Sequence, residues 1–290
     1  MANLIVGLGE VLWDIFPDER RLGGAPANVA YHAAVLGSES VVASRVGDDD
    51  HGTDLTVQLS DKGVDTARIQ TDTSHPTGTV EVSFVEGDPR YEIVRDVAWD
   101  FLEWTTDWEE LAKNCSAVCF STLAQRSPVS RATIERFLDA TSPDCRRVLD
   151  VNLRPPFVNG DILRSSIERA NVVKYNYQER LYLERFFWKD DIERWLCREA
   201  GVDVVCMTRG ATGCDLFTRD SRASVDARKI DASGGDPVGA GDAFSAALID
   251  GLLKRLALQD VARRANHYAG MVAARRGGMP EMPPLRDLGI

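Results

Sequence analysis

A glycine-rich turn that runs into an apolar helix carries the clearest chemistry in the sequence. Residues 235–244 read Gly-Asp-Pro-Val-Gly-Ala-Gly-Asp-Ala-Phe, and the apolar residues that follow recur at helical spacing. Gly239 and Gly241 lack a Cβ atom, so a ligand can approach their backbone closely. The first N–H groups of the helix have no partner within it and favour an anion. Asp242 would itself repel phosphate, but it could accept a proton from a hydroxyl while those N–H groups hold the phosphate being transferred.

The same turn also has a purely structural interpretation. A Gly-x-Gly before a helix is often only a tight turn, and an Asp in the first turn often only caps the helix or interacts with its dipole. Two commoner glycine motifs are absent from the sequence. It contains no Gly-x-x-x-x-Gly-Lys-Ser/Thr P-loop. Residues 7–9 and 239–241 lack the third glycine of the dinucleotide fingerprint, where Leu12 and Phe244 stand.

The composition is typical of a globular enzyme. At 290 residues the chain is within the range of a single α/β enzyme, and 44% hydrophobic residues support a large core. The net charge of −11 argues against a nucleic-acid partner, because phosphate backbones require basic surfaces. No apolar run approaches membrane-spanning length and no signal peptide precedes the first strand, so we expect no membrane partner and a cytoplasmic location.

Cysteine and histidine usage favours neither a disulfide framework nor a metal site. The six cysteines form no C-x-x-C pair and lie mostly in apolar surroundings, so we expect reduced thiols in the core. The four histidines are scattered, which gives little support to a His-built metal site or a Ser-His-Asp triad. The three adjacent acids at 48–50 are more consistent with a solvated loop than with a divalent-metal site.

Strands and helices alternate along most of the chain. Strands are predicted at residues 3–9, 41–47, 117–121, 147–151, 172–175 and 204–207, and helical segments at 54–62, 129–141, 161–170, 190–200 and 260–275. This alternation implies right-handed crossovers and a mostly parallel sheet. Ligands of such sheets bind beyond the carboxyl ends of the strands.

A second group of strands shows a half-exposed pattern. Residues 10–16 alternate polar and apolar side chains and place Asp14 on the polar face. Residues 78–85 and 91–95 alternate in the same way around a turn at 87–90 and predict a β-hairpin, which residues 98–101 follow. A small sheet with one apolar face needs a partner surface, either the main domain or another chain.

Two stretches resemble the signatures of the ribokinase-like (PfkB-type) carbohydrate kinases. Residues 236–249 resemble the C-terminal signature, and residues 22–31, Leu-Gly-Gly-Ala-Pro-Ala-Asn-Val-Ala-Tyr, resemble the N-terminal one. Gly37 and Gly47 follow the latter at the spacing that the signature expects. The resemblance covers essentially the whole chain and implies a single kinase domain over residues 1–290.

The resemblance implies an ATP-dependent sugar kinase with a three-layer α/β/α fold, a mostly parallel central sheet and a small β-sheet lid. The lid corresponds to about residues 10–17 and 78–101. In this family the last Asp of the signature, here Asp242, is the catalytic base, and the amides of Gly239, Ala240 and Gly241 form an anion hole for the γ-phosphate. The lid covers the sugar and often pairs with a second subunit, which is compatible with a homodimer.

The sugar-binding residues implied by the resemblance are Asp14, Gly23, Gly24 and Asn28. A carboxylate can accept from two sugar hydroxyls at once, an amide can both donate and accept, and paired glycines let the backbone touch a polyol. Without the resemblance, these residues would be a solvated strand carboxylate, a loop and a helix cap. Three further side chains could either reach the substrate or only pack in the lid: Arg95, Trp99 and Asp100.

The ATP-binding residues implied by the resemblance are Asn176, Glu179, Thr208, Gly210, Gly213 and Asn266. The first two match an Asn-x-x-Glu motif in which the Glu orders Mg²⁺ and its waters, although the pattern alone is very weak. Residues 208–213 resemble the nucleotide loop, and Asn266 matches a position near the adenine. Asp236 and Val238 match positions beside which the family often binds a monovalent cation such as K⁺. Pro237 replaces the Thr often found between them, which leaves this cation open.

The substrate is suggested by two looser resemblances. Residues 24–28 and 150–154 are more similar to fructokinases than to ribokinases, whose first signature usually has Lys-Gly in place of Ala-Pro. Fructose is therefore the first expectation, followed by another ketose or sugar acid, and then a nucleoside. A catalytically silent binding protein on the same fold is the alternative from another class, against which the intact Gly-Ala-Gly and Asp242 argue. A nicotinamide-dependent dehydrogenase ranks third because the dinucleotide fingerprint is absent.

Overall fold

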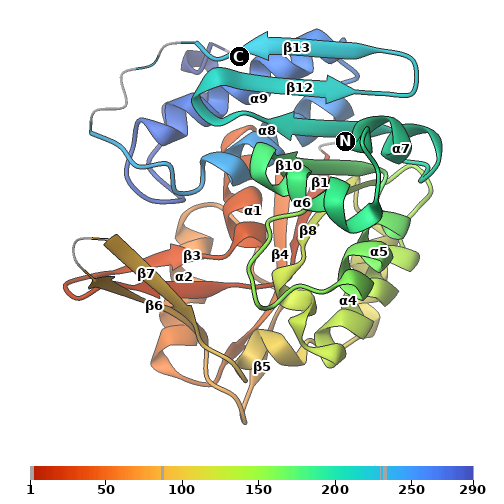
Figure 1. Cartoon of the computed structure of the whole chain (residues 1–290). Coiled ribbons are helices and arrows are strands. Elements are labelled where there is room, and N and C mark those ends of the chain that lie inside the picture. The colour runs from red at the N-terminus through yellow and green to blue at the C-terminus, as the bar shows by residue number, and fades with distance from the viewer. Residues whose placement is uncertain (1–2, 86–87, 229, 231–233, 290) are drawn as a thin grey trace.

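A large central sheet and a smaller sheet beside it organise the chain (Figure 1). The computed structural model describes residues 3–85, 88–228, 230 and 234–289. The central sheet has the order β13-β12-β11-β10-β9-β8-β1-β4-β5. Its strands are β1 (Leu4–Leu8), β4 (Glu39–Gly47), β5 (Ile69–Asp72), β8 (Ala117–Ser121), β9 (Arg146–Asp150), β10 (Val172–Asn176), β11 (Val204–Thr208), β12 (Gly213–Phe217) and β13 (Arg222–Asp226).

The strands from β5 to β11 pair in parallel, as the alternation of strands and helices predicts. The antiparallel hairpin of β12 and β13 extends this sheet at one edge and was not predicted. Residues 213–216 of β12 are buried, so their side chains lack the polar–apolar alternation that marks a half-exposed strand.

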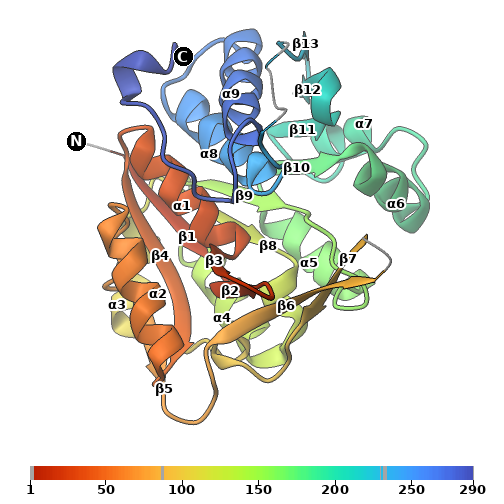
Figure 2. The same ribbon diagram turned by 90° about the vertical axis from the view of Figure 1, so that its left-hand side faces the viewer.

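Helices cover both faces of the central sheet and complete the predicted three-layer fold (Figures 1 and 2). One face packs against α3 (Thr106–Asn114), α4 (Pro128–Asp139), α5 (Gly160–Arg169), α6 (Tyr177–Phe187) and α7 (Ile192–Arg198). The other packs against α1 (Ala25–Val35), α8 (Ala240–Leu253) and α9 (Leu258–Ala273), and α2 (Asp50–Asp61) packs beside α1.

Neighbouring residues of a central strand pack into opposite cores. Ile5 lies in one apolar cluster and Val6 in the other, and the same holds for Val148 and Leu149. Successive side chains of a strand point to opposite faces, so a sheet covered on both sides needs apolar residues at nearly every position. This requirement explains the continuous apolar runs in the sequence.

The small sheet has the order β3-β2-β6-β7 and projects from one side of the central sheet (Figure 1). It contains β3 (Arg20–Gly23), β2 (Leu12–Ile15), β6 (Gly78–Val85) and β7 (Asp88–Ile93). The predicted hairpin is therefore present, although β7 begins within the residues expected to turn. The prediction missed β3, which overlaps the start of the N-terminal signature.

Residues 98–101 do not extend the small sheet. They form a short 3₁₀ helix, η1 (Ala98–Phe101), in which Asp100 accepts from the backbone N–H of Val97 at 3.3 Å. Trp99 is fully buried in the main core, and Asp100 pairs with Arg126 at 2.7 Å. Both side chains are thus committed to packing and do not line the cavity described below.

Asp49 caps α2 by accepting from Gly52 N at 2.7 Å, and it also accepts from Thr77 N at 2.8 Å. The acidic run therefore contributes a helix cap rather than only a solvated loop.

All six cysteines are buried and free. In the part of the chain that the structure describes, no helix is both long and apolar enough to cross a membrane.

Candidate functional site

A cavity of about 540 Å³ opens where the carboxyl ends of the central strands meet the small sheet and the first turn of α8. It collects many of the predicted site residues: Asp14, Gly24, Asn28, Asn176, Glu179, Thr208, Val238, Gly239, Gly241 and Asp242. The remaining predicted site residues are not among its lining residues: Gly23, Gly210, Gly213, Asp236, Ala240 and Asn266.

The glycine turn forms the entry to α8. Gly239 adopts a φ of 74° as the N-cap residue, and a Cβ there would lie 2.5 Å from Gly278 Cα. Only glycine fits this position without strain. The N–H of Ala240 donates to Pro237 O at 3.2 Å, so this amide of the predicted anion hole already has a partner. The N–H groups of Gly241 and Asp242 lie in the first turn of the helix, where intrahelical acceptors are lacking.

Asp242 accepts a hydrogen bond from Asn28, whose Nδ2 lies 2.7 Å from its Oδ2. Burial, followed by the nearby charge of Asp150, raises the pKa of Asp242 to about 6, while Lys174, Asn28 and Arg154 oppose the shift. The carboxylate is therefore mostly ionised at neutral pH and is a stronger base than an exposed aspartate. Such a group suits proton abstraction.

Asn28 lies in the second turn of α1 and is not the helix cap that its local sequence would suggest. The helix begins at Ala25 after Gly24, whose φ of 103° an L-residue rarely adopts. Asn28 is 5% exposed, and its Oδ1 has no hydrogen-bond partner among the described residues. A Cβ at Gly278 would lie 2.8 Å from this Oδ1. The Asn28 amide thus lies against both Asp242 and the backbone of Gly278.

Asp14 projects from β2 of the small sheet into the cavity. Burial raises the pKa of Asp14 to about 6, against the charges of Arg21 and Arg154. Gly23 makes room for this carboxylate, because a Cβ at Gly23 would lie 2.6 Å from Asp14 Oδ2. In the structure, Gly23 therefore contributes to the site by leaving space for the Asp14 carboxylate.

The Asn-x-x-Glu motif forms the capping box of α6. Asn176 Oδ1 accepts from Glu179 N at 3.0 Å, and Glu179 Oε2 accepts from Asn176 N at 2.8 Å. The other carboxylate oxygen of Glu179 accepts from Leu153 N at 2.8 Å. Burial and the charge of Asp150 raise the pKa of Glu179. The Asn-x-x-Glu motif therefore stabilises the start of α6, and both of its residues also line the cavity.

The glycines of the predicted nucleotide loop shape the backbone between β11 and β12. Thr208 ends β11 and lines the cavity. Gly210 has a φ of 55° in the short 3₁₀ helix η3 (Gly210–Thr212). Gly213 has a φ of 121°, and a Cβ there would lie 2.0 Å from Val225 O. These glycines hold the turn beyond Thr208 and do not themselves face the cavity.

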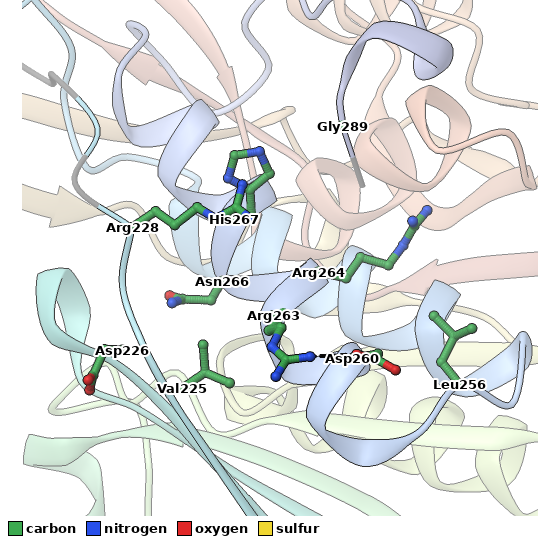
Figure 3. A pocket seen from close by; sticks show the side chains of 10 residues that line it. All are labelled: Val225, Asp226, Arg228, Leu256, Asp260, Arg263, Arg264, Asn266, His267 and Gly289. Atoms are coloured by element: carbon green, nitrogen blue, oxygen red, sulfur yellow. Dashed lines mark hydrogen bonds and ion pairs between the residues drawn. The ribbon is translucent and has the colours of Figure 1, made fainter.

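Asn266 lies apart from the other predicted ATP-binding residues, in a separate hollow of about 400 Å³ beside α9 (Figure 3). This hollow is lined by α9, the end of β13 and Gly289. Two of its arginines are paired, Arg263 with Asp260 at 2.9 Å and Arg264 with Asp250 at 2.6 Å. The structure does not bring Asn266 into the cavity that contains Thr208.

Polar residues that were not predicted as site residues complete the cavity: Glu10, Asp150, Asn152, Arg154 and Lys174. Lys174 donates to Asp150 Oδ2 at 2.6 Å. Burial alone would lower the pKa of Lys174, but the carboxylates of Asp150 and Asp242 outweigh it and raise this pKa. The sequence could have indicated this buried ion pair through a lysine within an apolar strand, because buried lysines require a partner.

Glu10 lies two residues beyond the end of β1 and is 1% exposed. Ser121 Oγ donates to its carboxylate at 3.2 Å. Burial raises the pKa of Glu10 to about 7, an effect that Ser121 and Arg154 partly oppose. A charged residue immediately after a buried first strand could have identified it from the sequence.

The carboxylate of Asp236 is already engaged by several donors. Its Oδ1 accepts from Val238 N at 3.1 Å, and its Oδ2 accepts from Gly277 N at 3.2 Å. Arg21 Nη1 lies 3.5 Å from the same Oδ2. A cation at this carboxylate would meet the charge of Arg21, so these contacts do not favour K⁺ there. Glu179, by contrast, lines the cavity with a carboxylate, the kind of oxygen ligand that Mg²⁺ prefers.

Comparison with known proteins identifies relatives along the whole chain. PH1459 of Pyrococcus horikoshii, named as a sugar kinase, is 31% identical over 295 residues, which cover 95% of this chain and 91% of the relative. Fructokinase-1 of Oryza sativa subsp. japonica is 26% identical over 310 residues, which cover 97% of this chain and 95% of the relative.

Solved structures agree with the fold. A crystal structure of PH1459, described as an uncharacterized sugar kinase in complex with ATP, matches with a TM-score of 0.82 and 28% identity over 98% of this chain and 96% of that chain. The fructokinase with bound ATP from Xylella fastidiosa matches with a TM-score of 0.85 over 99% and 97% of the two chains, and its 21% identity supports the fold alone. These matches confirm the ribokinase-like α/β fold.

The family assignment follows from a match over most of the length. The profile of the pfkB family carbohydrate kinases matches residues 14–284, which include both signatures and the cavity wall from Asp14 to Asp242. The chain therefore belongs to the pfkB family of carbohydrate kinases, which are phosphotransferases with an alcohol group as acceptor.

Proposed function

We propose that the protein transfers the γ-phosphate of ATP to a primary hydroxyl of a sugar, with fructose as the first candidate. One observation carries the proposal. Asp242, a carboxylate with a raised pKa, follows the glycine turn at the N-terminus of α8 and shares one cavity with Asp14 of the small sheet. A base beside an anion-binding helix end is the arrangement that phosphoryl transfer to an alcohol requires.

Asp242 acts as the base in this reaction. Held by Asn28, its ionised carboxylate accepts the proton of the sugar hydroxyl. The hydroxyl oxygen attacks the γ-phosphorus, and the bond from that phosphorus to the bridging oxygen of ADP breaks. Charge on the transferred group is stabilised by the helix end and the amides of Gly239 and Gly241. Ala240 contributes through the turn that its bond to Pro237 closes.

The sugar lies at the end of the cavity nearest the small sheet. Asp14 accepts from two sugar hydroxyls, and Asn28 and the backbone of Gly24 orient the ring. Apolar side chains form the remaining wall at this end: Leu12, Val80, Ile93 and Leu123. The small sheet acts as a lid that keeps water from the transferred phosphate.

The nucleotide phosphates lie at the opposite end, near Asn176, Glu179 and Thr208. Support comes from the ATP complexes of the two structural relatives named above. Mg²⁺, when bound, would be held through Glu179 and its waters and would neutralise phosphate charge. Gly210 and Gly213 keep the loop beyond Thr208 in the required conformation. K⁺ is not part of the proposed site, because the Arg21 guanidinium already faces the Asp236 carboxylate.

Fructose is supported by the fructokinase relatives and by residues 150–154. A sugar acid is the second candidate, and Arg154 favours it. The guanidinium of Arg154 lines the cavity, and the acceptor found for it among the described residues is the backbone oxygen of Leu153 at 3.0 Å. An unpaired arginine in a substrate cavity can bind a carboxylate through two parallel hydrogen bonds.

The experiment is ADP release by the purified protein with Mg-ATP and a panel of ketoses, aldoses, sugar acids, polyols and nucleosides. A single strong responder identifies the acceptor: fructose supports the first candidate and a sugar acid the second. If a sugar acid responds, Arg154→Met should raise its KM and leave the KM of ATP unchanged. No response from any acceptor would count against the proposal.

We also propose a cytoplasmic location and a homodimer formed through the small sheet. The free, buried cysteines fit a reducing compartment. Tyr91 on β7 is 58% exposed, as a residue at a sheet–sheet contact would be in a single subunit. Light scattering of the wild type and of Tyr91→Glu tests the dimer, which a monomeric wild type would exclude.

A further inference from the structure

Lys174 places an ammonium group against the glycine turn. It lies in the middle of β10, and its side chain is 7% exposed. Its Nζ donates to Asp150 Oδ2 at 2.6 Å, and a Cβ at Gly241 would lie 3.3 Å from the same nitrogen. The ammonium therefore occupies the point where β9, β10 and the first turn of α8 meet.

Ser245 connects this ion pair to α8. Its Oγ lies 3.1 Å from Asp150 Oδ2 and 3.1 Å from the backbone oxygen of Gly241. Asp150 thus links Lys174 to the helix that carries Asp242. Asp150 is the acceptor found for Lys174 Nζ among the described residues, and both side chains line the cavity.

We propose that Lys174 is a positioning residue for phosphoryl transfer: through Asp150 and Ser245 it holds the glycine turn, and with it Asp242, in place. Its ammonium charge also favours the ionised form of the Asp242 carboxylate. This inference rests on the proposed function, because it concerns the proton acceptor of that reaction. It adds a residue that neither signature contains.

Stability alone is a poor reason for the pair. Apolar residues of similar volume would pack in a buried strand at no electrostatic cost, as Val172 and Val173 do in the same strand. A buried ion pair often adds no stability over such residues, whereas loss of one partner leaves a costly unpaired charge. Interaction with the surrounding carboxylates therefore explains the Lys174 ammonium better than packing does.

Four groups shift the pKa of Asp242: Asp150 at the end of β9, Arg154 four residues later, Lys174 of β10 and Asn28 of α1. The charge of Asp242 in turn raises the pKa of Glu10 after β1 and of Cys119 on β8, and Glu179 of α6 faces Lys174. Within this set, Asp150 raises the pKa of Asp242 and Lys174 lowers it. Removal of the Asp150 charge should therefore lower the pKa of Asp242, whereas removal of the Lys174 charge should raise it.

The test is the pH dependence of kcat/KM for the wild type, Lys174→Met, Asp150→Asn and the double variant. We expect Lys174→Met to move the acid limb of the profile to higher pH by about one unit. At a given pH on that limb, kcat/KM should then be about tenfold lower than in the wild type. Asp150→Asn should move it down. The double variant should return close to the wild type, since it removes a neutral pair. Lys174→Arg should restore most of the profile.

Lys113→Met is the matched control. Lys113 is also paired with a carboxylate, Glu109 at 2.6 Å, but it is 59% exposed on α3 and away from the cavity. Its profile should match that of the wild type. Shifts of both single variants in the same direction, or lower turnover with unmoved limbs, would overturn the proposal and assign Lys174 to packing.

An infrared titration separates this inference from the proposed function. The band of the protonated Asp242 carboxyl, identified by its loss in Asp242→Asn, is followed against pH without any substrate. We expect its midpoint to rise in Lys174→Met and fall in Asp150→Asn, whether or not an acceptor has been found. Unchanged midpoints overturn the role of Lys174, whereas a wild type that phosphorylates nothing overturns the proposed function. If Lys174→Met does not fold, Asp150→Asn decides the first question alone.

Discussion

The Nδ2 atom of Asn28 lies 2.7 Å from Oδ2 of Asp242, although 214 positions separate the two residues in the sequence. This bond joins the N-terminal signature on α1 to the C-terminal signature on α8. The proposed base is therefore oriented by the segment that also carries the proposed sugar-binding glycines. Sugar binding and base alignment thus share one structural unit.

Asn28→Ala should lower kcat by about tenfold or more, because hydrogen bonds to charged groups contribute about 1.5–3 kcal/mol. The loss of this donor also raises the pKa of Asp242, so the acid limb of the rate profile should move to higher pH. Steady-state kinetics between pH 5 and 8 measure both effects. Asn114→Ala, which alters an asparagine at the exposed end of α3, is the control. An unchanged kcat would show that this bond does not orient the base.

Asp14→Ala should raise the KM for the sugar by roughly tenfold to a hundredfold, because the hydroxyl bonds to a carboxylate are lost. The KM for ATP should change little, since Asp14 lies on the small sheet and Thr208 on the central sheet. Initial rates with each substrate varied separately distinguish the two constants. A rise in the KM for ATP alone would place Asp14 outside the sugar site.

The rate of the wild type should fall as the pH falls through about 6. The pKa values of Asp242 and Asp14 are each raised to about 6. Asp242 must be ionised to accept a proton, and Asp14 must be ionised to accept hydrogen bonds with both of its oxygens. We expect kcat/KM to drop by about tenfold per pH unit, or more steeply, below this value. A profile that stays flat down to pH 5 would contradict the assignment of these carboxylates.

Glu10→Gln should stabilise the protein at alkaline pH. Burial raises the pKa of Glu10 from 4.5 to about 7, so its contribution to stability is fully present below pH 4.5 and is lost as the pH rises through 7. Glutamine cannot ionise, so the variant should gain about 3 kcal/mol over the wild type at pH 8 and little at pH 4. Denaturant unfolding at the two pH values measures the difference. Glu110→Gln, on the exposed side of α3, should show no such pH dependence.

The parallel core was predictable because its residues follow a strong local rule. A strand covered on both faces needs an apolar residue at nearly every position, and such runs separated by helical segments determine the layer order. The hairpin of β12 and β13 and the short strand β3 lack this signal. Residues 98–101 were grouped with the lid because they follow its hairpin in the sequence, whereas they form the short helix η1, in which Asp100 pairs with Arg126 from a distant segment.

The candidate site was predictable where a signature carried it and not where tertiary contacts create it. Asp242, Asp14 and Asn28 belong to the signatures or to the first strands, and the cavity brings them together. Lys174 and Asp150 become a pair only because β9 and β10 are adjacent in the sheet. Asn266 lies in a second hollow, a separation that spacing along the chain does not reveal.

The most direct test of the account is phosphorus NMR of the products formed from Mg-ATP and the acceptor by the wild type and by Asp242→Asn. The account predicts ADP and a sugar monophosphate on a primary hydroxyl with the wild type. The variant, folded by circular dichroism and still binding ATP, should form the product at least about 10²-fold more slowly, because a general base contributes about 10²–10⁴-fold. Equal rates of product formation by the two proteins would contradict the central claim that Asp242 is the base.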